Sequence, residues 1–493
     1  MGIIKRQTIK TSVVAYFGVL LGAANTLWLY PKFLTPTEIG LLNILTTIAL
    51  IIAPIAQLGV NGVILKYYPF VKSDEKKRAS FMYLILLIPF FGYLLAMLLL
   101  FICRNLLIEN FQDSPLLVDY LFVLVPFSFI LVGRNIADTF SRAQFRIAMP
   151  KFFKEVILRL VTFIVVILYS LNHMGLDFLV YGFIGAFGIN LILMLFYLRQ
   201  LSSIKYLFSL KPLGRELIRN SLIYGSYIIL SGFAGMVITK IDSWMISSKL
   251  GLADNGIFTI ALYIGLAIEM PKRSLNLISL PVISDAMKKN DIKSVKDLYQ
   301  KSALIQLIIG SLVLICVWVN IDALFSLIPN SETYIQGKYV VLFIGLAVLF
   351  DMATGVNNEI ILMSNFYRWN LFIVFGLIGI AVLNNLILIP IYGITGAAMA
   401  TAISIFLYNV AKFAVVYKYL HIQPFTLKNL WALLLALATY LIGISLPDTP
   451  YLWLDIFYRC GLLSVLYLAV HYRLKSSPDL VKVVDQVIAK VRP

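Results

Sequence analysis

Several charged side chains stand inside long apolar stretches of this sequence, where each needs a partner or a water-filled cavity. Lys240 and Asp242 lie in one such stretch. Glu269, Lys272 and Arg273 lie in the next. A charge near the centre of a bilayer costs about 2.5 to 3.5 kcal/mol on insertion scales. We therefore treat these residues as candidates for binding a ligand or for coupling to an ion.

The spacing of these charges limits how they can pair. Glu269 precedes Lys272 by three residues and Arg273 by four, so on a helix it can neutralise one cation and leave the other free. Lys240 and Asp242 are two residues apart and point to nearly opposite faces, so they need different partners. Lys240, Lys272 and Arg273 are therefore candidate ligand-binding residues, and Asp242 and Glu269 are candidates for ion coupling.

Other intramembrane charges fall into two groups. Arg134 is a further candidate ligand-binding residue, and Asp351 is a third coupling candidate. Oppositely charged residues four apart near the ends of apolar stretches are expected to form structural ion pairs, with their long stems reaching the interface. These pairs are Glu155 with Arg159, and Asp455 with Arg459.

The elements that must hold these residues are membrane-spanning helices. Of the 493 residues, 60% are hydrophobic and 13% charged, and the mean hydropathy is +0.90, which excludes a soluble globular protein. About 20 apolar residues suffice for one crossing. The sequence predicts about fourteen crossings, with connections too short for a folded extramembranous domain: 12–34, 39–63, 80–103, 119–140, 155–172, 177–198, 221–246, 256–283, 300–320, 338–360, 366–388, 395–417, 430–447 and 453–472.

The placement of basic residues predicts the orientation in the membrane. The formal net charge is +17. With a cytoplasmic amino terminus, the only Lys and Arg residues in the outer connections are Lys32, Arg104, Lys249 and Lys338. This asymmetry predicts that both termini are cytoplasmic. The positive charge is thus explained by membrane topology, and no nucleic-acid partner is expected.

An internal repeat divides the predicted helices. The segments 33–44 and 249–260 share Leu, an acid, Gly and Ile at identical spacing, and Gly40 and Gly256 are 216 residues apart. Because six crossings separate the two segments, the repeat is parallel, with its axis along the membrane normal. We expect an amino-terminal lobe over 1–220, a second lobe over 221–418, and two further helices with a tail over 419–493.

Several short motifs resemble one family of transporters. They are Tyr30-Pro-Lys-Phe-Leu-Thr-Pro-Thr-Glu-Ile-Gly-Leu-Leu-Asn-Ile44, Gln57-Leu-Gly-Val-Asn-Gly62, Asn255-Gly-Ile-Phe258 and Tyr392-Gly-Ile-Thr-Gly-Ala-Ala398. The sequence resembles the polysaccharide and O-antigen flippases, whose superfamily also contains the MATE drug exporters and the lipid II flippase. The resemblance implies two six-helix lobes, alternating access, and export of an undecaprenyl-diphosphate-linked oligosaccharide from the inner to the outer leaflet.

The same resemblance gives roles to polar residues. Lys and Arg can offset the desolvation of a diphosphate with charge-assisted hydrogen bonds. Asn25, Gln57 and Asn61 could bind sugar hydroxyls, although hydrogen bonds between helices are an alternative use. The resemblance implies a monomer in the bacterial inner membrane, with membrane lipids and polysaccharide polymerase machinery as its partners, in lipopolysaccharide or other polysaccharide biosynthesis.

Two other functions can be weighed from the sequence. A polysaccharide-joining enzyme typically has a large, arginine-rich outer loop, which is missing here, and there is no phosphate-binding Gly-x-x-x-x-Gly-Lys-Ser/Thr motif. We therefore expect no enzyme and no cofactor. The three histidines lack metal-ligand spacing, so no metal site is expected. A MATE-like, cation-coupled exporter of amphipathic molecules remains the alternative.

Overall fold

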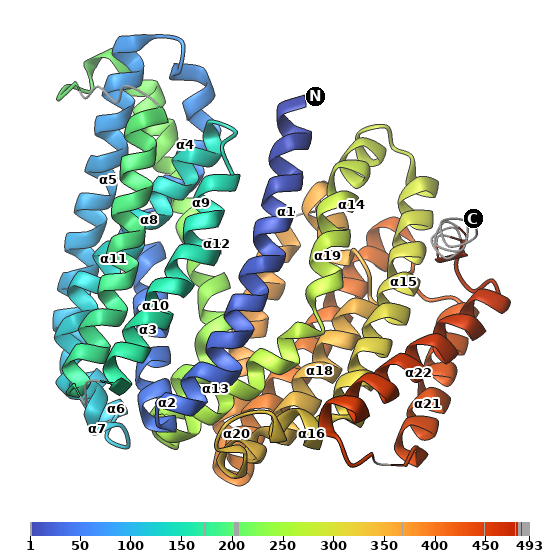
Figure 1. Ribbon diagram of the computed structural model, residues 1–493. Coiled ribbons are helices and arrows are strands. Elements are labelled where there is room, and N and C mark those ends of the chain that lie inside the picture. The colour runs from blue at the N-terminus through green and yellow to red at the C-terminus, as the bar shows by residue number, and fades with distance from the viewer. Residues whose placement is uncertain are drawn as a thin grey trace. The chain divides into compact units, whose positions relative to one another are not determined.

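The protein is helical throughout the part that the computed structural model describes, which is residues 2–171, 174–201, 207–366, 368–447, 449–478, 480–481 and 485 (Figure 1). Within these described residues, eleven helices are long and apolar enough to cross a membrane. The predicted all-helical, polytopic membrane fold is therefore confirmed. The main helices are α1 (Gly2–Ala23), α3 (Pro36–Gln57), α4 (Val60–Val71), α5 (Glu75–Ile102), α8 (Leu124–Ala143), α10 (Leu158–Leu171), α11 (Leu176–Leu201), α12 (Gly214–Lys249), α13 (Leu252–Ala267), α14 (Met270–Lys288), α15 (Ile292–Val319), α18 (Lys338–Ala353), α19 (Asn357–Met363), α20 (Arg368–Leu420), α21 (Leu427–Ser445) and α22 (Leu452–Arg473).

Helix α20 is long enough for two crossings. Its 53 residues would span about 80 Å if straight, against about 30 Å of hydrocarbon. Gly393 breaks it with φ 58° and ψ −137°, a conformation that favours glycine. A Cβ atom on Gly396 would lie 2.0 Å from the carbonyl oxygen of Leu388, so the chain passes close to itself here. The break falls between the predicted crossings 366–388 and 395–417, so the helices observed are compatible with about fourteen crossings.

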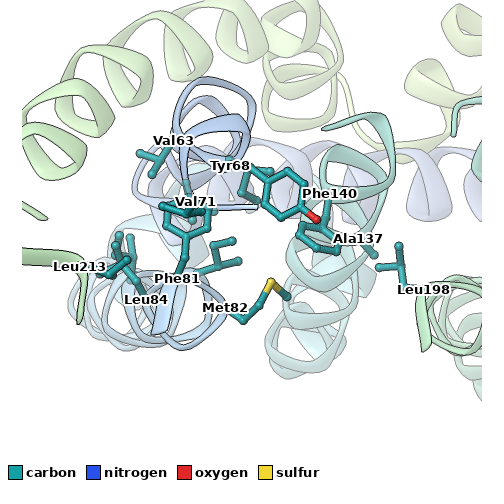
Figure 2. Packing of buried hydrophobic residues seen from close by; sticks show 14 of the residues in the cluster. Val63, Tyr68, Val71, Phe81, Met82, Leu84, Ala137, Phe140, Leu198 and Leu213 are labelled. Carbon is teal, nitrogen blue, oxygen red and sulfur yellow. The ribbon is translucent and has the colours of Figure 1, made fainter. Parts of the chain in front are cut away.

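The described chain forms two compact units, Met1–Thr259 and Ile260–Pro493. In the first unit, α3 packs against α5, α8 and α12, and α8 also packs against α4 and α11. Figure 2 shows the apolar cluster that holds α4, α5 and α8 together. At its centre the rings of Tyr68 and Phe140 meet edge to face with centroids 5.0 Å apart, and Phe81 and Val60 are fully buried beside them.

The repeat-related segments of the first unit contact each other reciprocally. A Cβ atom on Gly40 would lie 1.8 Å from the carbonyl oxygen of Leu252, and one on Gly256 would lie 2.0 Å from the carbonyl oxygen of Pro36. Both glycines therefore permit backbones to touch. Gly40 corresponds to Gly256 in the repeat, and Pro36 corresponds to Leu252, since each pair is 216 residues apart. The two contacts are therefore equivalent, as expected where a two-fold axis relates the segments.

The second unit is built around α15 and α18. Helix α15 packs against α14, α18 and α21, while α18 packs against α20. The carboxy-terminal pair α21 and α22 packs on itself and on α15, through a cluster that includes Leu307, Ala432, Leu463 and Tyr467. The division into 1–220, 221–418 and 419–493, which was drawn from the repeat, stays a prediction.

The ion pairs expected to be structural are confirmed. Arg159 Nη2 lies 2.9 Å from Glu155 Oε2, and Arg459 Nε lies 3.2 Å from Asp455 Oδ1. Each pair joins residues one helical turn apart. The stabilising partner of each charge is thus local, and these four residues need no ligand to explain them.

Candidate functional site

The membrane helix made of α3 and α4 is broken in its interior. Leu58 and Gly59 both have positive φ angles, 43° and 71°. Glycine adopts this conformation without steric cost, and Gly59 also lets the neighbouring helix approach, since a Cβ atom on it would lie 2.1 Å from the carbonyl oxygen of Gly225. Irregular backbone inside a membrane is tolerated where it lies within protein or lines a cavity.

A cavity of about 160 Å³ lies beside this break. Its lining comes from α3, α4 and α12, with one residue from α8. The α12 residues lie near the middle of that helix, between Ile228 and Met236. The lining residues are Leu50, Ala53, Pro54, Gln57, Gly59, Asn61, Asn135, Ile228, Ile229, Gly232 and Met236.

Two of the predicted amide residues, Gln57 and Asn61, lie together in this cavity. Asn61 Nδ2 donates a hydrogen bond to Gln57 Oε1 at 2.5 Å. The other two amide atoms, Gln57 Nε2 and Asn61 Oδ1, are buried and have no hydrogen-bond partner among the described residues. A buried polar atom without a partner costs about 1 to 3 kcal/mol. The amide pair beside the cavity therefore keeps one donor and one acceptor unsatisfied within the protein interior.

Lys240 lies on the face of α12 that lines the cavity. It follows Met236 by four residues and Gly232 by eight, which places all three on one helix face. Its side chain is partly buried, and no carboxylate of the described residues lies within ion-pair distance of it. Asp242 points to nearly the opposite side of the helix. A cation thus stands about one turn from the cavity.

The second unit holds a separate group of buried charges. Lys272 on α14 forms an ion pair with Asp351 on α18, which also interacts electrostatically with Lys412 on α20. Lys272 therefore pairs across helices. The sequence left Glu269 to pair with either Lys272 or Arg273, and the pairing with Arg273 stays a prediction. Glu359 is 9% exposed and accepts a hydrogen bond from Asn276 Nδ2 at 2.9 Å.

Lys412 is the residue that sequence reasoning missed. Its side chain is 3% exposed, and its ammonium lies 3.7 Å from the ring centroid of Tyr408. The signal was present in the sequence, because a lysine inside the stretch 395–417 follows a tyrosine by four residues, the spacing for a cation–π contact on one helix face.

Arg134 and Asn25 are not among the residues that line the cavity. Arg134 is 7% exposed, and its guanidinium lies 5.0 Å from the ring centroid of Phe187, with no carboxylate of the described residues in ion-pair range. Asn25 donates to the Arg159 carbonyl oxygen at 2.8 Å, which is the alternative, interhelical use. The side chain of Arg273 lies outside the described part of the structure.

Comparison with known proteins places the chain in a family. Residues 31–325 match the family described as polysaccharide biosynthesis proteins, which covers more than half of the sequence. The chain belongs to this family. This agrees with the polysaccharide-related family that the sequence motifs indicated. No curated protein matches the sequence.

Solved structures with the same fold include flippases and exporters. The lipid II flippase MurJ, in an inward closed conformation, has a TM-score of 0.71 and 16% identity, covering 94% of this chain and 99% of its own. An inward-facing MATE-family multidrug resistance transporter has a TM-score of 0.64 and 14% identity, covering 84% and 98%. A superfamily transporter from Pyrococcus furiosus, described as having a binding pocket of reverse polarity, has a TM-score of 0.52 and 12% identity, covering 85% of this chain and 95% of its own. At these identities the likeness shows the fold.

Proposed function

We propose that this family member is a flippase that moves an undecaprenyl-diphosphate-linked oligosaccharide from the inner to the outer leaflet of the bacterial inner membrane by alternating access. The glycan is a repeat unit of O-antigen, capsule or exopolysaccharide. The observation that carries the proposal is the cavity at the α3–α4 break, with two amide residues in its lining and Lys240 on the same face of α12 as its lining residues. Amides suit a glycan, and a lysine suits the diphosphate.

Such transport requires the protein to bind the substrate, but no bond is made or broken. The diphosphate must lose water, and charge-assisted hydrogen bonds from Lys240 would offset part of that cost. Lys272, Arg273 and Arg134 are proposed as further anion-binding residues along the route. Two negative charges moving outward across an inside-negative potential of 100 mV gain about 4 to 5 kcal/mol. The membrane potential alone could therefore drive export.

Coupling to an ion would use the carboxylates of the membrane helices. Asp242, Glu269 and Asp351 are the proposed coupling residues. Asp351 already binds Lys272, so proton or sodium binding there would have to open that pair. We propose that the protein works as a monomer among membrane lipids, with both termini in the cytoplasm, and hands its product to polysaccharide polymerase machinery.

The alternative is a MATE-like exporter of amphipathic molecules. Several solved structures of this fold are MATE transporters, which favours that reading. A pocket that binds a cationic substrate is expected to carry a carboxylate. Here the charge on the cavity face of α12 is Lys240, and this sign favours an anionic substrate.

The experiment uses purified protein in proteoliposomes with a fluorescent, undecaprenyl-diphosphate-linked oligosaccharide. Wild type should move it between leaflets, and Lys240→Ala should reduce the rate about 10-fold or more, the loss expected for a hydrogen bond to a charged group. Lys249→Ala, an exposed lysine on the same helix, is the matched control and should leave the rate unchanged. An unchanged rate in Lys240→Ala, or transport of a cationic dye in place of the lipid, would overturn the proposal.

A further inference from the structure

A long segment of the second unit carries basic residues and no acidic ones. From residue 360 to residue 447 the sequence contains no Asp or Glu, and its bases are Arg368, Lys412, Lys418 and Lys428. Lys412 is buried, whereas the other three side chains are exposed. These three stand at the ends of crossings, on the side that the charge distribution predicts to be cytoplasmic. The segment therefore presents only cations on that side.

Aromatic contacts join the start and the end of α20 at this place. The rings of Phe366 and Tyr419 stack with their centroids 5.0 Å apart, and Trp369 Nε1 donates a hydrogen bond to the Tyr419 hydroxyl oxygen at 3.0 Å. Arg368 directly precedes Trp369, and Lys418 directly precedes Tyr419. The ring contacts therefore bring two cations from distant parts of the sequence to one edge of the unit.

Three donor groups of this edge have no acceptor among the described residues. Neither Arg368 nor Lys418 forms an ion pair with a carboxylate there. The Tyr419 hydroxyl oxygen accepts from Trp369, which leaves its own hydrogen to donate elsewhere. A guanidinium, an ammonium and a hydroxyl group together suit the oxygens of a phosphate.

The exposed surface beside these donors is aromatic. Trp369, Phe372 and Tyr417 are all exposed. Phe372 follows Arg368 by four residues, so it lies on the same helix face, one turn further from the predicted cytoplasmic end. Trp and Tyr are typical of the depth at which lipid head groups meet acyl chains. A ligand at this edge would thus meet cations at one end and rings along the membrane, which matches an amphipathic molecule with an anionic head.

We propose that this edge, made of Arg368, Lys418, Tyr419, Trp369 and Phe372, binds an anionic phospholipid of the cytoplasmic leaflet. The phosphate accepts from the guanidinium, ammonium and hydroxyl groups, and an acyl chain lies along the exposed rings. Basic sites between membrane helices on the cytoplasmic side suit such head groups. Binding here is independent of the proposed transport, because no residue that lines the cavity takes part. The bound lipid bridges the start and the end of α20.

The test measures lipid binding to the detergent-purified protein by native mass spectrometry. Phosphatidylglycerol and phosphatidylcholine with identical acyl chains are titrated separately, so that only the head group differs. Wild type should bind the first phosphatidylglycerol about 10-fold more tightly or more, since two cations near the membrane surface favour an anionic lipid. The double variant Arg368→Gln/Lys418→Gln should lose most of this preference, and Tyr419→Phe should lose part of it.

The matched control is Lys288→Gln/Lys293→Gln, which removes two exposed lysines of the same unit on the predicted cytoplasmic side and should leave the preference unchanged. An equal loss in both double variants would show diffuse attraction to charge and overturn the site. Equal wild-type affinities for the two lipids would also overturn it, and this comparison needs no variant.

Competitors separate the possible sources of the phosphate. Inorganic phosphate should displace the lipid no better than chloride at equal ionic strength. Specific displacement by phosphate would assign the edge to a free anion and overturn the proposal. Displacement by an undecaprenyl-diphosphate-linked oligosaccharide would assign the edge to the transported substrate, and it would overturn a separate phospholipid site while leaving the flippase proposal standing.

Discussion

Asp351 is predicted to stabilise the second unit as the shared counter-ion of two buried lysines. It pairs with Lys272 across helices and interacts electrostatically with Lys412, whose side chain is almost fully buried. The substitution Asp351→Asn keeps the size of the side chain and removes its charge. Two cations would then face each other in a membrane interior with the nearest counter-charge gone.

The size of the effect follows from the burial of the pair. The side chains of Lys272 and Asp351 are 12% and 24% exposed, so solvent screens their interaction only in part. Removal of one partner from a buried ion pair costs about 3 to 5 kcal/mol. In a unit of this size, each kcal/mol of lost unfolding free energy lowers the melting temperature by about 2 to 4 °C. The expected fall in melting temperature is therefore roughly 6 to 20 °C.

The assay is thermal unfolding of the detergent-purified protein, followed by size-exclusion chromatography of the fraction that stays soluble. Asp322→Asn is the matched control, because Asp322 pairs with Lys338 but is 72% exposed, and its loss should cost less than about 1 kcal/mol. Adding Lys272→Met to Asp351→Asn should recover at least half of the lost stability. The reasoning is refuted if Asp351→Asn melts like wild type, or if the double variant is less stable than the single one.

Four further outcomes are expected. Gly40→Ala should destabilise the protein by about 1 to 3 kcal/mol, because its new methyl group would meet the Leu252 carbonyl oxygen. Gly185→Ala, with open space around it, should melt like wild type. Equal stability of the two variants would contradict the backbone contact. Gly393→Val should cost about 1 to 3 kcal/mol by thermal unfolding, since φ there is 58°, and no loss would argue against the reversal inside α20. Outward flipping should accelerate when a potassium gradient with valinomycin makes proteoliposomes inside-negative, and a rate independent of potential would rule out movement of net charge. In a cysteine-free background, Asn290→Cys should react with an impermeant maleimide only from the cytoplasmic side, and labelling from outside would reverse the topology.

Much of the fold could be predicted because its signals are local in the sequence. Apolar length marks the crossings, and the spacing of four residues marks the pairs Glu155 with Arg159 and Asp455 with Arg459. The 216-residue repeat pointed to segments whose glycines, Gly40 and Gly256, turn out to permit reciprocal backbone contacts. In each case the physics depends on residues that are close in sequence or related by the repeat.

The arrangement of the site could be predicted only in part, because it depends on contacts between distant segments. Gln57 and Asn61 are four residues apart, a spacing that places side chains on one helix face. The structure adds the break at Leu58 and Gly59 and the cavity beside them. The ion pair of Lys272 with Asp351 joins residues 79 apart, which no periodicity reveals. The spacing of Tyr408 and Lys412 signals only their local contact, and it gives no sign of the distant Asp351 with which Lys412 interacts.

The central claim is that the cavity face of α12 contacts the substrate, and photocrosslinking tests it most directly. A benzoylphenylalanine at Ile229, which lines the cavity, should crosslink to a radiolabelled undecaprenyl-diphosphate-linked oligosaccharide, whereas one at Tyr227, which is 67% exposed on the same helix, should not crosslink to its glycan. Analysis of the crosslinked peptide then shows whether the glycan or the lipid part of the substrate is attached to it. Crosslinking of the glycan at Tyr227 but not at Ile229 would contradict the account.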